Sequence, residues 1–266
     1  PPRSTLFPYT TLFRSPIGGL ARRASFLASL KAQAARDGDG LLILAGPCEF
    51  LPTDLFPKAP GETARALAAA FARLPYDLGY ALPAEARWLA DNGAALPPYF
   101  AVASERPAFE VRQAGAVRVG LLLFPALAPG LAKAPAVTAQ AVAERALALR
   151  ERSDIVVGLS PWGAEAEGDF LETRGHTVDV LLGAGPGQGF PARPMANGKV
   201  LWIRTYPQGK ALYLVAVKEL PRRVPDWKWI RDKNAEVLLQ SLTETITNDP
   251  DMDALLAGFN AKNPAD

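Results

Sequence analysis

Few side chains in this sequence could do chemistry, and the single cysteine is the most reactive of them. Cys48 follows a short apolar segment, 41–45, and stands next to Glu49. One interpretation is a redox or covalent thiol at the mouth of a site. The other is an inert, partly buried thiol, because free cysteine often behaves as a small hydrophobe. The adjacent carboxylate disfavours a thiolate, and no second cysteine exists for a disulfide or a cysteine-based zinc site.

The single histidine, His176, precedes a predicted strand at 178–182. It should therefore lie at the end of that strand opposite the loop that follows. One imidazole needs partners to hold a metal, so we interpret His176 as a surface turn residue. Asp179 is expected to accept local backbone hydrogen bonds rather than to ligate an ion.

Two buried-strand patterns, at 154–159 and 178–182, each run into a loop of small residues. Loops at strand ends are where α/β proteins usually place their chemistry. The first loop, 160–163, contains Trp162. Its indole could stack on a base or a sugar, or it could simply fill space, and filling is favoured.

The second loop reads GAGPGQG at 183–189, and its Gly183 and Gly185 are candidate binding residues. It lacks the Gly-Lys-Ser/Thr ending of a P-loop. Pro186 also removes an amide donor that a dinucleotide-binding loop would need, and no predicted helix follows at once. A loop built of turn residues is the favoured interpretation.

The elements that must position these residues alternate between strands and helices. Apolar residues at three- and four-residue spacing predict helices at 20–34, 61–74 and 137–150. Further helices are predicted at 83–91, 164–174, 232–247 and 251–260. Strands are predicted at 41–45, 117–124, 154–159 and 178–182, with 96–100 and 108–112 as further candidates that flank a loop. Segment 76–80 is predicted as a short strand or a turn. Segments 200–205 and 211–217 are predicted to form an antiparallel hairpin. This order predicts an α/β fold with a mixed sheet or two packed sheets.

Composition is that of a globular protein, with 49% hydrophobic and 21% charged residues. The longest apolar run, 119–128, is too short to span a bilayer, so no transmembrane segment is predicted. Residues 221–233 mix bases with tryptophan. We interpret them as a linker that packs its tryptophans on a neighbouring domain, and a nucleic-acid or membrane surface is the alternative.

The first fifteen residues, PPRSTLFPYTTLFRS, resemble the translation of a common DNA-sequencing adapter, with a natural proline-rich leader as the alternative. Excluding Arg3 and Arg14 from the 29 Lys and Arg residues leaves as many bases as the 27 acids. No nucleic-acid partner is therefore expected. We expect the natural sequence to begin near Pro16, with its true start and any secretion signal missing.

The remaining segments, in their order and their residue sequences, resemble the metallophosphatase domain of the bacterial periplasmic 5′-nucleotidase and UDP-sugar hydrolase family. This family belongs to the calcineurin-like phosphoesterase superfamily. The matching stretches are 18–24, 41–46, Tyr76-Asp77 with Glu85, 155–163, 178–183 and 209–210. The resemblance implies an α/β fold, a metallophosphatase-like sandwich of two mixed β-sheets flanked by helices. It implies a domain at 16–217 that lacks its natural start, followed at 218–266 by a basic and aromatic linker and C-terminal helices. The related enzymes continue into a second domain, so the chain is expected to be cut at Asp266.

The resemblance also implies two divalent metals, held by aspartate, asparagine and histidine, and a metal-activated water that splits phosphate esters. Carried over position by position, the visible ligands fall on Pro47, Pro83, Ala84, Pro161, Gly185 and Gly187. The first motif, Asp-x-His, would precede Gly18. None of the six residues has a metal-binding side chain, so we assign no metal ligand and expect no cofactor. Glu85 alone keeps its acidic side chain, and it joins Cys48 as a candidate catalytic residue.

We therefore expect a retained scaffold whose dinuclear site has been dismantled. Such a protein would serve as a binding or scaffold component of the bacterial envelope, periplasmic or extracellular, with another envelope protein or domain as its partner. One alternative is a metal-dependent phosphoesterase that acts on nucleotides or UDP-sugars with a divalent metal pair. A second alternative is a thiol-redox protein that uses Cys48.

Overall fold

The structure is a computed structural model that describes residues 19–50, 61–128, 130–205, 209–222 and 224–260. The adapter-like segment 1–15 lies outside these ranges. The helices are α2 (Leu20–Asp37), α3 (Gly61–Phe71), α4 (Pro83–Asp91), α5 (Ala136–Arg150), α6 (Ala164–Arg174), the short 3₁₀ helix η1 (Gly175–Thr177) and α7 (Pro250–Asn260). The strands are β1 (Leu44–Ala45), β2 (Leu78–Ala81), β3 (Phe100–Val102), β4 (Ala108–Ala114), β5 (Val117–Leu123), β6 (Ile155–Ser160), β7 (Val180–Gly183), β8 (Phe190–Met195), β9 (Val200–Arg204), β10 (Ala211–Val217) and β11 (Ala235–Ser241).

A mixed six-stranded sheet in the order β4-β5-β6-β7-β9-β8 forms one layer of the fold. Strands β5, β6, β7 and β9 run parallel, while β4 and β8 pair antiparallel at the two edges. The central strands are buried on both faces, which explains their continuous apolar sequences. Their carboxyl ends lie along one margin of the sheet, where the loops that follow β6 and β7 meet.

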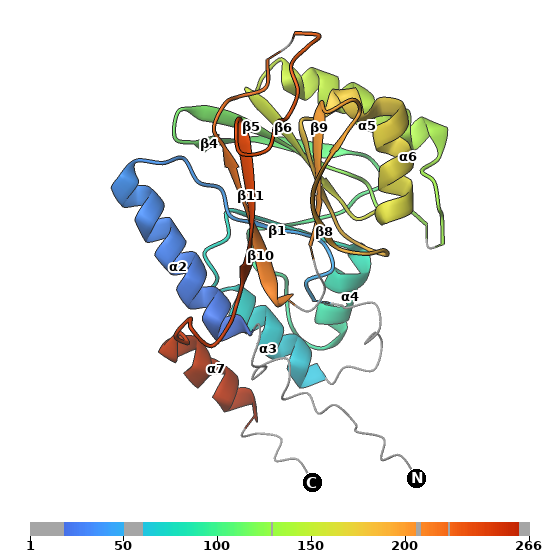
Figure 1. Cartoon of the computed structure of the whole chain (residues 1–266). Helices are drawn as coiled ribbons and strands as arrows, with labels where there is room; N and C mark the ends of the chain where they lie inside the picture. The colour runs from blue at the N-terminus through green and yellow to red at the C-terminus, as the bar shows by residue number, and fades with distance from the viewer. Residues whose placement is uncertain (1–18, 51–60, 129, 206–208, 223, 261–266) are drawn as a thin grey trace, which may run out of the picture.

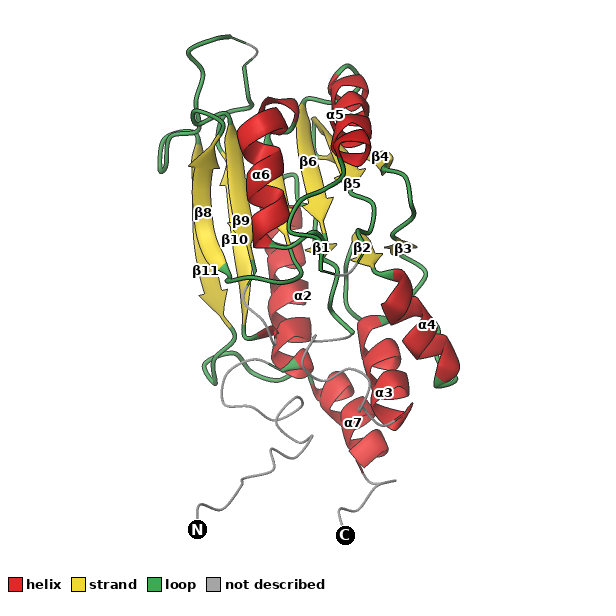
Figure 2. Cartoon of the chain, turned by 90° about the vertical axis from the view of Figure 1, so that its right-hand side faces the viewer, coloured by secondary structure: helices red, strands yellow, loops and turns green. Residues whose placement is uncertain are grey.

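The second layer consists of a parallel sheet, β1-β2-β3, and the antiparallel pair β10-β11. An apolar core lies between the two layers, with Tyr80 of β2, Leu121 of β5 and Ile203 of β9 among its members. A second core lies between the six-stranded sheet and helices α5 and α6. Figures 1 and 2 show these helices on one side of the strands, with α2, α3 and α7 on the other. The predicted α/β sandwich is confirmed.

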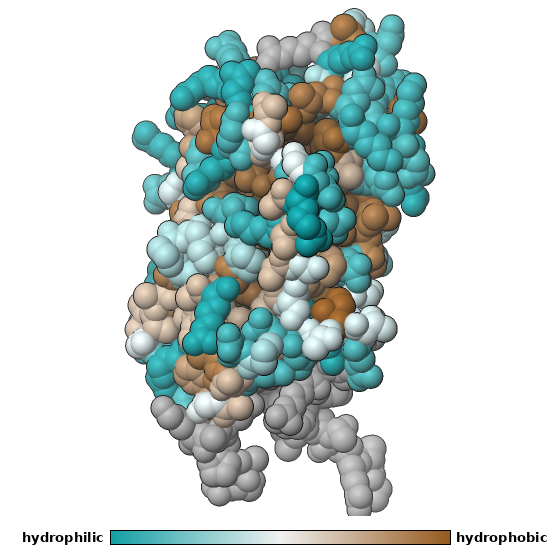
Figure 3. All heavy atoms as spheres, turned by 90° about the vertical axis from the view of Figure 1, so that its left-hand side faces the viewer, coloured by the Kyte–Doolittle hydropathy of each residue, from teal (hydrophilic) through white to brown (hydrophobic). Residues whose placement is uncertain are grey.

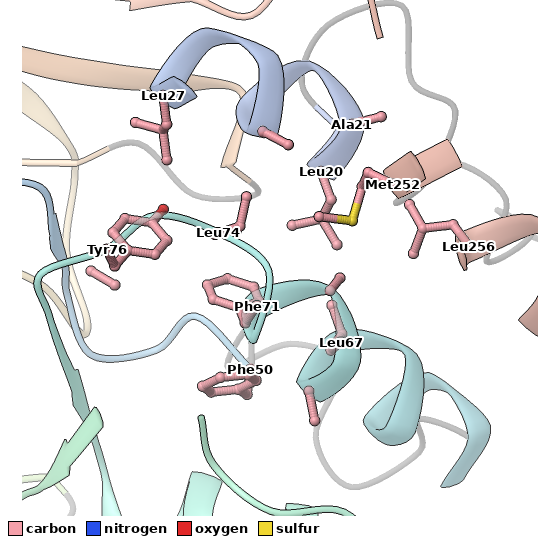
Figure 4. Close-up of a cluster of buried hydrophobic side chains, with 14 of the residues drawn as sticks. Leu20, Ala21, Leu27, Phe50, Leu67, Phe71, Leu74, Tyr76, Met252 and Leu256 are labelled. Atoms are coloured by element: carbon pink, nitrogen blue, oxygen red, sulfur yellow. The ribbon is translucent and has the colours of Figure 1, made fainter. Parts of the chain in front are cut away.

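The third core joins the helices on the outer side of the second layer. Figure 4 shows how Leu27 of α2, Phe71 of α3 and Met252 of α7 point into one cluster with Phe50. Burial of such side chains contributes about 1.5–3 kcal/mol each, so α7 stabilises the fold although it lies at the end of the described chain. On the face that Figure 3 shows, polar and apolar side chains are intermixed.

The helix predictions at 20–34, 61–74, 83–91, 137–150, 164–174 and 251–260 are confirmed as α2 to α7. The strand predictions are confirmed in position for β1, β2 and β4 to β7, although β1 is shorter than predicted. The strand predicted at 96–100 is displaced, since β3 begins at Phe100. No helix in the described part of the chain is both long enough and apolar enough to cross a membrane.

The antiparallel hairpin predicted for 200–205 and 211–217 is wrong. Strand β9 lies inside the six-stranded sheet, between β7 and β8, whereas β10 pairs with β11. The physical reason is burial: β9 is buried at every position, which requires neighbours on both sides, and β10 is only half-buried. The hairpin was predicted because β9 and β10 are neighbours in the sequence, but their different burial shows that they lie in different sheets.

The helix predicted at 232–247 is also wrong, because 235–241 forms β11. Its sequence AEVLLQS contains good helix formers, but seven consecutive residue pairs with β10 override that local preference. Strand β8, FPARPM, was not predicted because of its two prolines. Proline is tolerated in an edge strand, and β8 is the edge of its sheet.

The tryptophans of the basic segment pack against the sandwich. Trp227 and Trp229 lie edge to face, with ring centroids 4.8 Å apart, and both are buried in the core between the two sheet layers. The Trp229 indole N–H donates to the Asp179 carbonyl at 2.9 Å. These contacts pack the segment 218–233 against the predicted domain 16–217. The domain boundary at residue 217 stays a prediction.

Candidate functional site

The loops that follow β6 and β7 are bonded to each other at the carboxyl ends of these strands. The Gly163 N–H donates to the Ala184 carbonyl at 3.0 Å, and the Ala164 N–H donates to the Pro186 carbonyl at 2.8 Å. A Cβ atom on Gly185 would lie 2.5 Å from the Pro161 carbonyl oxygen. Gly185 also has a φ of +76°, which disfavours any other residue. Candidate Gly185 thus lies where the two loop backbones touch, while candidate Gly183 contacts the Glu167 side chain.

The third loop, which follows β1, brings Cys48 to the same place. The Gly185 backbone N–H interacts with the Cys48 sulfur. The Cys48 backbone has a φ of +73°, and its N–H donates to Glu85 Oε2 at 3.0 Å. Three of the candidates predicted from separate segments, Cys48, Glu85 and Gly185, therefore meet at one site.

Glu85 is buried and holds the backbone of this site. Its carboxylate accepts hydrogen bonds from the N–H groups of Cys48 at 3.0 Å, Phe50 at 2.9 Å and Leu82 at 2.7 Å. The Leu82 contact completes a capping box at the start of α4. Burial raises the pKa of Glu85, and the three N–H donors oppose that rise. Glu85 thus joins the β1 loop to α4.

The Cys48 thiol is protonated at neutral pH. Burial, and after it the nearby Glu85 carboxylate, raise its pKa to about 12, while the Gly185 N–H acts in the opposite direction. Its neighbour Glu49 forms an ion pair with the buried Arg23 at 3.0 Å. The thiolate is the reactive form of cysteine, so this environment disfavours nucleophilic chemistry.

Trp162 is buried in the core between the six-stranded sheet and α5 and α6, with 5% of its surface exposed. Its ring packs edge to face on Phe124 at 4.8 Å and on Phe170 at 5.7 Å. Its indole N–H donates to the Pro125 carbonyl at 2.6 Å. The side chain fills the space beneath its loop, as the sequence favoured, and it offers no stacking face to a ligand.

Two charged residues that the sequence analysis missed lie beneath the 183–189 loop. Arg204 ends β9 and Glu167 lies in the first turn of α6, and their side chains form a buried ion pair. Arg204 Nη2 also donates to the carbonyls of Gly185 and Pro186, both at 2.9 Å. The guanidinium therefore holds the loop in place by charge-assisted hydrogen bonds.

Glu167 is fully buried and faces Gly183 closely enough that a Cβ there would lie 2.0 Å from its Oε2 atom. The Trp202 indole N–H donates to the same oxygen at 3.0 Å. Burial raises the pKa of Glu167 to about 7, and the Arg204 guanidinium limits that rise. A charge inside the buried pattern VLWIR of β9 is the sequence signal that could have revealed the pair.

The remaining ionisable candidates lie away from this site. His176 is exposed in η1, before β7, as predicted. Asp179 is buried, accepts from the Val156 N–H at 2.7 Å and pairs with Arg150 at 2.8 Å. It serves the backbone, as predicted, and it is far along β7 from the glycine loop.

Among the residues that the structure describes, those at the implied ligand positions do not fit a pair of divalent metals. The ligand positions implied by the resemblance hold proline, alanine and glycine at Pro47, Pro83, Ala84, Pro161, Gly185 and Gly187. Across the part of the chain that the structure describes, no group of three or more His, Cys, Asp or Glu side chains could hold a metal ion. The nearest carboxylates, those of Glu85 and Glu167, are already bonded to protein donors.

Comparison with solved structures identifies the architecture. The chain is similar to the sulfate thiohydrolase SoxB of Thermus thermophilus, solved in complex with glycerol, with a TM-score of 0.70 and 17% identity over 92% of this chain and 47% of that one. It is similar to the calcineurin-like phosphoesterase YfkN of Bacillus subtilis, with a TM-score of 0.58 and 13% identity over 94% of this chain and 90% of that one. The NAD nucleotidase NadN of Haemophilus influenzae gives a TM-score of 0.61 and 12% identity over 92% of this chain and 54% of that one.

The chain thus spans about half the length of SoxB and NadN. No protein-family model matches the sequence, and no curated protein matches it significantly. At these identities the similarity establishes the fold, and the site has to be interpreted from its own residues.

Proposed function

We propose, from the calcineurin-like metallophosphatase fold that this chain adopts, that it is a non-catalytic binding or scaffold domain of the bacterial envelope. The observation that carries the proposal is the replacement of side chains at the strand ends. Where the fold's enzymes would bind metal, this chain has backbone-shaping residues, including Pro47, Pro161 and Gly185. Loss at every visible motif, with the apolar strands intact, supports a dismantled site.

The charged groups around the site support the same conclusion. Glu85 accepts from three backbone N–H groups, Glu49 pairs with Arg23, and Glu167 pairs with Arg204. Each carboxylate stabilises a loop or a helix start. A metal that recruited any of them would leave buried donors unpaired, at a cost of about 1–3 kcal/mol for each group.

The envelope location and the partner rest on the family resemblance alone. The 5′-nucleotidase and UDP-sugar hydrolase family is periplasmic, and we propose that this chain works in the periplasm or outside the cell. Another envelope protein or domain is the proposed partner. With the surface charge balanced, recognition by shape and apolar contact is favoured over recognition of a polyanion.

Neither alternative has a specific observation in its favour. A metal-dependent phosphoesterase would need ligands that the described residues do not supply. A thiol-redox protein would need Cys48 as a thiolate, and its raised pKa, about 12, opposes that.

An assay of hydrolysis tests the proposal. The purified chain would be incubated with AMP, a UDP-sugar and bis(p-nitrophenyl) phosphate, with added Mn²⁺ or Zn²⁺ and with a chelator. We expect no hydrolysis above the blank under any condition. Hydrolysis that needs metal and disappears on chelation would contradict the proposal. The same purification from host cells that lack the gene is the control, and hydrolysis that appears equally in it comes from a contaminating host enzyme.

A further inference from the structure

The outer edge of β11 is an unprotected strand edge. Its ladder with β10 covers all seven residues without a bulge, and no other ladder to β11 occurs among the described residues. Leu238 and Leu239 are 52% and 47% exposed, although their side chains point to opposite faces of the pair. Unpaired backbone groups beside exposed leucines form a template for another strand.

Three of the other edge strands carry features that prevent such pairing. Strand β8 has two prolines and a register shift, and β4 has Glu110 and Arg112 among its seven residues. Strand β3 is only three residues long. By contrast β11 has no proline, no lysine and a single charge, Glu236. Strand β1 has only two residues, and β10 also lacks proline and charge. The two exposed leucines in the middle of β11 distinguish its edge and make it the candidate interface.

The backbone groups that β11 offers can be identified from its ladder. Bonds from Lys218 N to Asn234 O and from Leu242 N to Lys210 O show that even-numbered residues face β10. The N–H and C=O groups of Val237 and Leu239 therefore face the open side. Near the strand ends, the Ala235 carbonyl accepts from the Asp232 N–H and the Ser241 carbonyl accepts from the Gln240 side chain. Val237 and Leu239 thus form the centre of the open edge.

The sequence of β11 is complementary to itself when read in the opposite direction. In AEVLLQS, an antiparallel pairing centred on Leu238 places Val237 opposite Leu239 of a second copy. It places Glu236 opposite Gln240, and Ala235 opposite Ser241. Apolar residues meet apolar ones, and no like charges meet. Val237 and Leu239 of the two copies would then exchange backbone hydrogen bonds, the pattern that flanks a non-hydrogen-bonded central pair.

From these observations we propose that β11 is a self-association site, at which two copies of the chain pair their β11 strands antiparallel about a two-fold axis through Leu238. The result is one continuous four-stranded sheet in the order β10-β11-β11-β10. An isologous contact of this kind closes on itself and stops at a dimer. The proposal is independent of whether the chain is catalytic.

Sedimentation of the whole chain across micromolar to millimolar concentrations tests this proposal. We expect the wild type to dimerise. The Leu238→Lys and Leu238→Glu variants each place like charges opposite each other at the axis, so each should weaken dimerisation by roughly tenfold. An equal mixture of the two should restore dimerisation, because lysine then faces glutamate. The Leu147→Lys variant, at a leucine 48% exposed on α5, is the matched control and should dimerise like the wild type.

A proline provides the second test. Leu239→Pro removes an N–H that faces the open side and leaves the ladder to β10 intact, so we expect a folded monomer. A wild type that stays monomeric throughout would overturn the proposal. A dimer that survives both charge variants, or a mixture that shows no rescue, would do so as well. A monomer whose β11 amides become protected from exchange only on adding another protein would assign the edge to that partner and refute self-pairing.

Discussion

Arg204 and Glu167 form an ion pair beneath the 183–189 loop with 2% and 0% of their side-chain surfaces exposed. The guanidinium also bonds the carbonyls of Gly185 and Pro186. The Arg204 guanidinium, which is itself paired with Glu167, thus holds the 183–189 loop through two of its backbone carbonyls. The loop is ordered by the chain's own side chains.

Breaking this pair should destabilise the fold strongly. We expect Arg204→Met to lower the free energy of unfolding by about 3–5 kcal/mol at pH 8, because it leaves a buried carboxylate without its partner. Urea denaturation followed by circular dichroism measures the change. Lys133→Met, which breaks the exposed pair with Asp169, is the control and should have no measurable effect. Equal stability of Arg204→Met and the wild type would show that the pair is not needed.

The raised pKa of Glu167, about 7 against 4.5 for a free side chain, makes stability depend on pH. The folded state binds this proton more tightly than the unfolded state does. The stabilisation is therefore complete below pH 4.5 and is lost as the pH rises through about 7, by at most about 3 kcal/mol. Glu167→Gln cannot lose a proton. Between pH 5 and pH 8 the wild type should therefore lose unfolding free energy relative to the Glu167→Gln variant. A difference between the two proteins that stays constant with pH would contradict this.

Glu85 should matter for stability rather than for catalysis. Glu85→Ala removes the acceptor of the Cys48, Phe50 and Leu82 N–H groups, so we expect a loss of about 2–4 kcal/mol of unfolding free energy. Thermal and urea denaturation measure it. Glu105→Ala, at an exposed position, is the control and should change stability little. If both variants behaved alike, Glu85 would be free for another role.

Cys48 should be a slow thiol. Its pKa of about 12 predicts alkylation by iodoacetamide at neutral pH at least about 100-fold slower than that of a free cysteine. The rate is read from mass spectra over time. The same protein in denaturant should react at the free rate, which shows that the fold provides the protection. Reaction of the folded protein as fast as a free thiol would revive a thiol-based activity.

The sequence was sufficient for elements whose local pattern and tertiary environment agree. Helices α4 and α6 were predicted with their observed bounds, since Pro83 and Asn92-Gly93 mark the ends of α4 and α6 connects two strand patterns. The meeting of Cys48, Glu85 and Gly185 was implied only by the family resemblance, which places all three at or beside its metal motifs. They come from two different sheets and from α4, so no single strand pattern predicts it.

What the sequence did not reveal depends on long-range pairing. The helix formers of β11 become a strand only because β10 is available beside them, and β9 is recognised as central only from its burial on both faces. The Arg204–Glu167 pair joins residues 37 positions apart, so the charge in the apolar pattern of β9 marks Arg204 as unusual but does not identify its partner. Glu167 lies among other charged residues of α6, where it looks like a surface charge.

The metal content of the purified chain tests the central claim most directly. The protein would be incubated with excess Mn²⁺ or Zn²⁺, dialysed and measured by elemental mass spectrometry against a metallophosphatase with an intact site. A dismantled site predicts far less than one metal per chain and no change in thermal stability on adding metal. Two tightly held metals per chain would contradict the account.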